Sequence, residues 1–167
     1  SLAEKGIESE PEETGKTFAE NAKIKAAAAM RASGLPAIAD DSGISVEALG
    51  GAPGVYSARY CGVHADDAGN NALLLKNMRG EQNRKAKFVC AVALVYPDGR
   101  TVTAQGECEG ILLEEPRGEN GFGYDPLFYL PQYGETMAEL PAEQKNQISH
   151  RAEAVKKLTA FLSNYTF

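Results

Sequence analysis

The chain has 167 residues, 43% of them hydrophobic, and a formal net charge of −6. This length and apolar content predict one compact α/β domain over residues 1–167. The negative charge argues against a surface for duplex nucleic acid, which needs a basic face, but it permits a small anionic ligand where cations or a metal gather locally.

The cysteines and the hydropathy of the sequence indicate the cellular compartment. Cys61, Cys90 and Cys108 are odd in number, widely spaced and without a Cys-x-x-Cys motif, so they predict neither a disulfide framework nor a zinc site. The longest apolar run, 88–96, is far shorter than a bilayer span, and no basic-then-apolar leader opens the sequence. We therefore expect a cytoplasmic protein with no membrane or nucleic-acid partner.

The first predicted element is a helix that begins at a capping box. Thr17 and Glu20 have the Ser/Thr-x-x-Glu spacing, and strong helix formers follow over 22–32. Gly34 is expected to end this helix.

A short apolar run, 35–39, follows and is interpreted as a buried strand that ends at Asp40, Asp41, Ser42 and Gly43. Ligands of open α/β sheets bind beyond such strand ends. Because side chains alternate along a strand, Asp40 and Asp41 point to opposite faces, and only one can face a pocket. The other is expected to fix a turn by accepting backbone N–H groups, and a simple Asx turn without catalysis is the alternative.

The remaining elements follow from periodicity and turn residues. They are a loop at 50–54, a helix at 68–78, a central strand at 87–96, a turn at 97–99, a strand at 101–105, a sheet extension at 111–113, a glycine-rich loop at 118–126, and a last helix capped by Ser149 with Val155, Leu158 and Leu162 on its apolar face. The predicted fold class is α/β, a mixed, twisted central sheet flanked by helices, with a ligand cleft at the strand ends.

An acidic segment precedes the first helix and contains Glu8, Glu10, Glu12 and Glu13. Glu12 or Glu13 could join Asp41 in holding Mg²⁺, which takes one or two carboxylates together with substrate phosphates. The alternative is a solvated acidic loop that places negative charge near a helix N-terminus.

Two later segments carry groups suited to a nucleoside phosphate. Phe122 and Tyr124 lie among glycines, so the backbone can approach a flat ligand while a ring stacks on it; the alternative is a turn pinned by core aromatics. Lys145, His150 and Arg151 surround the start of the last helix, where N–H groups and cations can hold phosphate or base oxygens; the alternative is an ordinary exposed surface. With the acidic groups, these segments predict a nucleoside phosphate site.

Five motifs follow one another along the chain: TGKTFAENA (14–22), ADDSG (39–43), GAPGVYSARY (51–60), GFGYDPLF (121–128) and SHR (149–151). In this order they resemble the inosine/xanthosine triphosphate pyrophosphatase family, over essentially the whole chain. The resemblance implies a cytoplasmic, Mg²⁺-dependent homodimer that hydrolyses ITP, dITP and XTP to the monophosphate and pyrophosphate.

The resemblance also implies roles for individual residues. Asp41 is implied as the proton acceptor and as a metal ligand, with Glu12 as the second carboxylate and Glu13 as the fallback. The residues that match nucleotide-binding positions of the family are Ser42, Phe122, Gly123, Tyr124, Asp125, Lys145, His150 and Arg151.

Base chemistry is consistent with this substrate class. Hypoxanthine and xanthine present an acceptor at O6 and a donor at N1, the reverse of adenine, so a complementary site rejects ATP by leaving polar groups unpaired. Guanine shares that edge, so rejection of GTP must depend on its 2-amino group.

Family members also open with a strand, a Ser/Thr-x-Asn-x-x-Lys loop that contacts the phosphates, and a helix, which this sequence lacks. We therefore expect a domain that is N-terminally incomplete relative to the family. Two alternatives stay open: a catalytically inactive module that binds a purine nucleotide, and a pyrophosphatase that acts on other nucleotides, such as pyrimidines.

Overall fold

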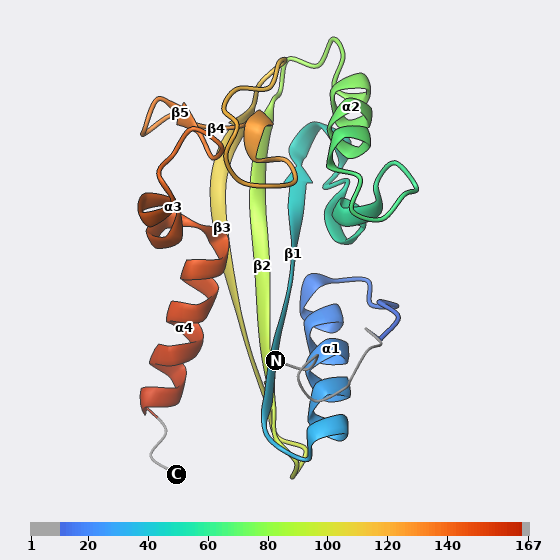
Figure 1. Ribbon diagram of the computed structural model, residues 1–167, viewed down its shortest axis with the longest axis vertical. Coiled ribbons are helices and arrows are strands. Elements are labelled where there is room, and N and C mark those ends of the chain that lie inside the picture. The colour runs from blue at the N-terminus through green and yellow to red at the C-terminus, as the bar shows by residue number, and fades with distance from the viewer. Residues whose placement is uncertain (1–10, 165–167) are drawn as a thin grey trace.

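The computed structural model describes residues 11–164, which form a long sheet with helices on both sides (Figure 1). The helices are α1 (Phe18–Ser33), α2 (Asp67–Asn77), α3 (Ala142–Ile148) and α4 (His150–Asn164), with short 3-10 helices η2 (Glu47–Leu49), η3 (Gly54–Arg59) and η4 (Asp125–Leu127). The strands are β1 (Ala37–Val46), β2 (Lys85–Val95), β3 (Thr101–Leu112), β4 (Phe128–Leu130) and β5 (Glu135–Thr136).

The five strands lie in the order β1-β2-β3-β4-β5. All four pairings are antiparallel, so the parallel pairing expected of a mixed sheet is not found among residues 11–164. The predicted hairpin between β2 and β3 is confirmed, and its turn is closed by the Tyr96 N–H, which donates to the Arg100 carbonyl at 2.9 Å. The expected α/β architecture of a central sheet flanked by helices is therefore confirmed.

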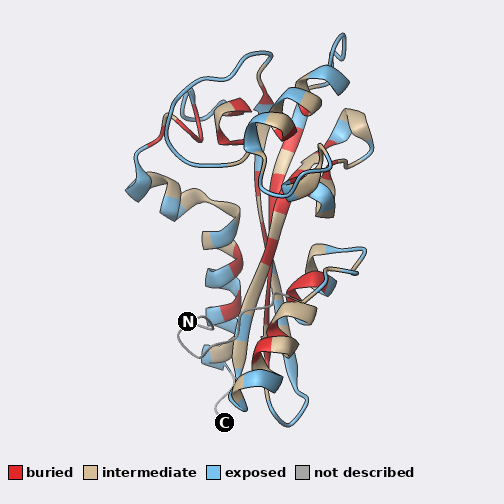
Figure 2. Ribbon diagram, turned by 45° about the vertical axis from the view of Figure 1, so that its right-hand side comes forward, coloured by how far each residue is buried: buried red, intermediate tan, exposed pale blue. Residues whose placement is uncertain are grey.

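Strand β2 is the centre of the fold because both of its faces are covered. On one face Ala91 and Ala93 pack against α1, and on the other Cys90 and Val92 pack against α4. Buried residues accordingly run along the middle of the sheet and the inner sides of both helices (Figure 2). This confirms the prediction of a central strand that is apolar on both faces.

The helix α1 begins and ends as predicted. The Thr17 hydroxyl accepts a hydrogen bond from the Glu20 N–H at 3.2 Å, and the Glu20 carboxylate accepts one from the Thr17 N–H at 3.2 Å. Gly34 ends the helix in the left-handed conformation, with φ of 70°, where glycine lacks a Cβ penalty. Of the four helices in residues 11–164, none has the length and apolar character needed to cross a membrane.

Strand β1 corrects the prediction for the Asp-Asp-Ser-Gly segment. The strand does not end before Asp40 but continues to Val46, and Asp40, Asp41 and Ser42 pair with Val92, Ala91 and Cys90 of β2. The expected turn is therefore wrong, because pairing with a long central strand outweighs local turn preference. The expected burial is wrong as well: β1 is the first strand of the sheet within residues 11–164, and Leu35 and Ile38 are 55% and 58% exposed.

Two elements near the C-terminus differ from expectation. The segments 101–105 and 111–113 were expected as separate strands, but β3 is continuous to Leu112. Helix α3 was not predicted, and Val155 is 44% exposed, so the buried face of α4 is carried by Ala154 and Leu158. Glu8, Glu10 and the expectations about the start of the chain lie outside the described residues.

Candidate active site

One cleft of about 930 Å³ contains every residue that was predicted to bind the nucleotide. Its lining includes Ser42, Phe122, Gly123, Tyr124, Asp125, Lys145, His150 and Arg151. They come from β1 and, much later in the sequence, from the glycine-rich loop, α3 and the start of α4. The cleft crosses the middle of β1, so its expected position beyond a strand end is wrong, since β1 does not end there.

The glycine-rich loop presents one aromatic ring to the cleft and buries the other. Phe122 is 65% exposed, with Lys145 Nζ 4.9 Å from its ring centroid. Tyr124 is 5% exposed, and its hydroxyl donates to the Ser57 carbonyl at 2.8 Å. Tyr124 thus pins the loop to the core, as the alternative interpretation had it, while Phe122 is free to stack on a flat ligand.

Asp125 orders the same loop from within. Its buried carboxylate accepts a hydrogen bond from the Phe122 N–H at 3.0 Å and forms an ion pair with Lys145 of α3. The left-handed Gly121, with φ of 87°, leaves room for this pair, because a Cβ there would overlap the Asp125 carboxylate. The loop and α3 are therefore joined beneath the Phe122 ring.

His150 and Arg151 begin α4 at the other side of the cleft. The His150 ring stacks on Phe88 with centroids 5.0 Å apart, and its Nδ1 is buried without a hydrogen-bond partner among the described residues. Burial, and secondarily the charge of Arg151, lower the pKa of His150 to about 4, so the ring is neutral at pH 7. Arg151 Nε and Nη2 donate to Asp40 Oδ2 at 3.0 and 2.9 Å.

Asp41 lies on the opposite face of β1 from Asp40, as side-chain alternation predicted: its carboxylate accepts hydrogen bonds from α1, whereas that of Asp40 accepts them from Arg151 of α4. It is 8% exposed; Lys25 Nζ donates to its Oδ1 at 2.8 Å, and Asn21 Nδ2 donates to its Oδ2 at 3.2 Å. Burial raises the pKa of Asp41 above its usual value, although Lys25 and Asn21 oppose the shift. A carboxylate with a raised pKa is suited to accept a proton near neutral pH.

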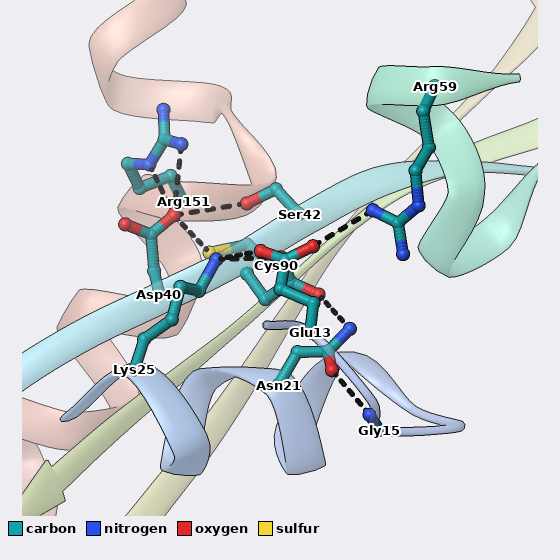
Figure 3. Close-up of polar contacts among 10 residues, drawn as sticks. Glu13, Gly15, Asn21, Lys25, Asp40, Ser42, Arg59, Cys90 and Arg151 are labelled. Carbon is teal, nitrogen blue, oxygen red and sulfur yellow. Dashed lines mark hydrogen bonds and ion pairs between the residues drawn. The ribbon is translucent and has the colours of Figure 1, made fainter. Parts of the chain in front are cut away.

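A chain of charges connects Asp41 to Glu13 and Arg59 (Figure 3). Lys25 Nζ is 3.0 Å from Glu13 Oε1, and Arg59 Nη1 donates to Glu13 Oε2 at 3.1 Å. Burial alone would lower the pKa of Lys25, but its hydrogen bonds to Asp41 and Glu13 raise it. Burial alone would raise the pKa of Glu13, but Lys25 and Arg59 lower it. The shifts in pKa of Lys25 and Glu13 both favour the charged forms of these side chains.

The donor set fits Mg²⁺ only in part. Glu13 and Asp41 both bind the same ammonium nitrogen, so two carboxylates converge on one cation, as they do in sites where phosphate oxygens complete the shell of Mg²⁺. No group of three or more His, Cys, Asp and Glu side chains in residues 11–164 could hold a metal. Glu12, the expected second ligand, is exposed and forms no ion pair within those residues, so the geometry favours the fallback Glu13.

Helix η3 contributes residues both to the cleft and to the charged group that contains Glu13. Ser57 and Ala58 of η3 line the cleft, whereas Arg59 reaches Glu13 on the other face of β1. Glu12, Glu13 and Arg59 line a smaller hollow of about 250 Å³.

Comparison with known proteins decides the family. Residues 1–161 match the Ham1 family. The chain belongs to this family. It is 54% identical over 156 residues to a dITP/XTP pyrophosphatase of Desulforamulus reducens, covering 92% of this chain and 78% of that protein, and 57% identical over 151 residues to one of Listeria monocytogenes, covering 89% and 74%. These relatives confirm the resemblance drawn from the five motifs.

Solved structures of the Ham1 family have the same fold. The Ham1 protein of Staphylococcus aureus superposes with a TM-score of 0.92 at 46% identity, over 98% of this chain and 85% of that one. A Ham1 protein of Coxiella burnetii superposes with a TM-score of 0.89 at 45% identity, over 94% and 82%.

Sequence reasoning missed the residues that surround Asp41. Asn21 and Lys25 stand four apart on α1 and therefore share one face of that helix, a spacing that could have identified them. One of Asp40 and Asp41 was expected to fix a turn, but the structure pairs Asp40 with Arg151 and Asp41 with Lys25. Arg59 lies within a family motif, yet nothing in its neighbourhood indicates that it pairs with Glu13, 46 residues earlier.

Proposed function

We propose that this chain is a nucleoside triphosphate pyrophosphatase that hydrolyses ITP, dITP and XTP to the monophosphate and pyrophosphate and so removes non-standard purines from the nucleotide pool. The observation that carries the proposal is the gathering of all eight predicted nucleotide-binding residues around one cleft. The names of its relatives in the Ham1 family support the substrate class.

In this proposal the cleft holds the base and ribose. Phe122 stacks on the base, because its exposed ring is backed by the Lys145 cation and its backbone is fixed by Asp125. The neutral ring of His150 lines the cleft and can contact the nucleotide without adding a positive charge. A site that pairs with O6 and N1 of hypoxanthine or xanthine would leave groups unpaired against adenine.

The phosphates are proposed to extend from the cleft toward the charged group that contains Glu13, Lys25, Asp41 and Arg59. Both cations are partly exposed, and both are already held in place by carboxylates. Arg151 supplies a further guanidinium from the cleft side. Cations that face the transferring phosphoryl group stabilise its negative charge.

Asp41 is proposed as the base that takes the proton of the attacking water. Its burial and raised pKa support this role, and Asn21 keeps the carboxylate oriented. Glu13 and Asp41 would hold Mg²⁺ together with substrate oxygens, and the ion would neutralise charge on the phosphates. Binding of the ion would require the Lys25 ammonium to move away from between them.

The test is product analysis. The chain is incubated with Mg²⁺ and ITP, dITP, XTP, GTP, ATP or pyrimidine triphosphates in turn, and pyrophosphate is separated from orthophosphate. Pyrophosphate from the first three alone supports the proposal. Binding of ITP by calorimetry without product would support the inactive purine-nucleotide module instead, and turnover of pyrimidine nucleotides would support the other alternative.

A homodimer and a cytoplasmic location are part of the same proposal, because the family resemblance implies both. Sedimentation of the chain at micromolar concentration tests the first. A mass of twice 17.8 kDa is expected, and a monomer at all concentrations would count against the dimer.

A further inference from the structure

The peptide groups of Gly123 are held by two side chains of α2, a helix with no predicted part in the site. Asp67 Oδ2 accepts a hydrogen bond from the Gly123 N–H at 2.6 Å, and Asn71 Nδ2 donates to the Gly123 carbonyl at 2.9 Å. Asp67 and Asn71 stand one helical turn apart, so they share a face of α2. One glycine, 52 and 56 residues away in sequence, is thus gripped at both of its backbone groups.

Packing does not explain the position of this glycine. A Cβ at Gly123 would meet no atom within 4 Å, and its φ of 61° lies in the left-handed region. The next residue, Tyr124, is buried and fixed to Ser57, but the preceding Phe122 is 65% exposed. The direction of the Phe122 ring therefore depends on how the backbone at 122–123 is held.

The side-chain amide of Asn71 also has an unfavourable feature. Its Oδ1 is buried and has no hydrogen-bond partner among the described residues. A buried polar atom without a partner is unfavourable, and within residues 11–164 the other end of this amide donates a hydrogen bond only to the Gly123 carbonyl. Asp67 itself lines the cleft.

We propose that Asp67 and Asn71 are positioning residues that clamp the Gly123 peptide and thereby set the Phe122 ring for the nucleotide base. This inference rests on the proposed function of the cleft. It assigns to α2 the alignment of the base-stacking loop. Neither side chain is required to touch the reacting phosphate.

The substitution Asn71→Ala removes the donor and Asp67→Ala removes the acceptor, whereas Asp67→Asn keeps an acceptor oxygen. We expect each alanine variant to raise the KM for ITP about fivefold, with little change in kcat, since a hydrogen bond of ordinary strength is lost from ground-state alignment. Asp67→Asn should restore a KM close to that of the unmodified chain. The matched control is Asn77→Ala, on the same helix, whose amide donates to the Tyr60 hydroxyl at 2.8 Å instead.

A second readout is independent of catalysis. Amide hydrogen exchange of the loop 119–125 should accelerate at least about fivefold in both alanine variants and stay unchanged in Asn77→Ala. Exchange and KM that match those of the unmodified chain would overturn the clamp, and so would faster exchange with an unchanged KM. If the unmodified chain turned over no nucleotide, the proposed function would fail, while the exchange rates would still decide whether α2 holds the loop.

Discussion

The ammonium of Lys25 lies 2.8 Å from Asp41 Oδ1 and thereby joins helix α1 to a carboxylate of β1. The same nitrogen contacts Glu13. Because burial raises the pKa of Asp41 and Lys25 opposes that shift, the lysine sets how readily the carboxylate accepts a proton. This pair links the fold of α1 to the chemistry that we propose.

Replacing Lys25 should change the pH dependence of turnover. In Lys25→Met the pKa of Asp41 loses a cation that lowers it, so the acid limb of the kcat profile should move up by about one pH unit. Lys23→Met, an exposed lysine on the same helix, should leave the limb in place. The profile is measured from pH 4 to 9, and an unmoved acid limb in Lys25→Met would contradict the role given to the pair.

Arg151 is expected to act mainly in binding. Arg151→Ala should raise the KM for ITP about tenfold, since a charged hydrogen-bond donor is lost from the cleft. Arg100→Ala is the control, because Arg100 also pairs with an aspartate, Asp98, and does not line the cleft. Steady-state kinetics decide the question: a fall in kcat with constant KM would assign Arg151 to the transition state.

Gly106 should control the placement of α4. A Cβ at this position would overlap the backbone of His150 and Ala154, and a helix backbone cannot rotate away as a side chain can. We expect Gly106→Ala to lower the free energy of unfolding by about 1–3 kcal/mol and to weaken ITP binding, because His150 and Arg151 move with the helix. Thr103→Ala, exposed on the same strand, is the control for urea unfolding; equal stability of the two variants would refute the packing argument.

His150 predicts a loss of stability in mild acid. Its pKa falls from an ordinary 6.5 to about 4 in the folded chain, so below pH 6.5 the unfolded chain binds a proton that the folded chain does not. Stability should therefore fall as the pH drops from 6.5 toward 4, by up to about 1.4 kcal/mol per pH unit from this group.

The variant His150→Gln isolates this contribution, because it removes the titrating group and keeps a polar side chain. Urea unfolding at several pH values should give a shallower slope between pH 4 and 6.5 for the variant. Identical slopes would mean that His150 is not buried as a neutral ring.

Local sequence rules predicted the elements whose cause is local. The box of Thr17 and Glu20 sets the start of α1, and the apolar run of β2 needs both faces covered, so each could be recognised without the rest of the chain. The same local rules gave a wrong prediction for the segment at Asp40, because a partner strand some fifty residues later holds its turn-forming residues in β1.

The candidate site likewise contains residues that the sequence identified and contacts that it did not. Motif order identified the cleft residues, because a family pattern carries information about groups that meet only in the fold. The contacts of Lys25 with Glu13 and Asp41 span 12 and 16 residues, and that of Arg59 with Glu13 spans 46. Contacts between residues so far apart in the sequence depend on how α1, β1 and η3 pack, which no single segment specifies.

The most direct test of the account is ITP hydrolysis by Asp41→Asn beside the unmodified chain, with ITP binding measured separately by calorimetry. The substitution keeps the shape of the side chain but removes the base. We expect pyrophosphate and the monophosphate from the unmodified chain, and turnover at least about a hundredfold lower in Asp41→Asn with ITP still bound. Undiminished turnover in Asp41→Asn, or release of orthophosphate by the unmodified chain, would contradict the account.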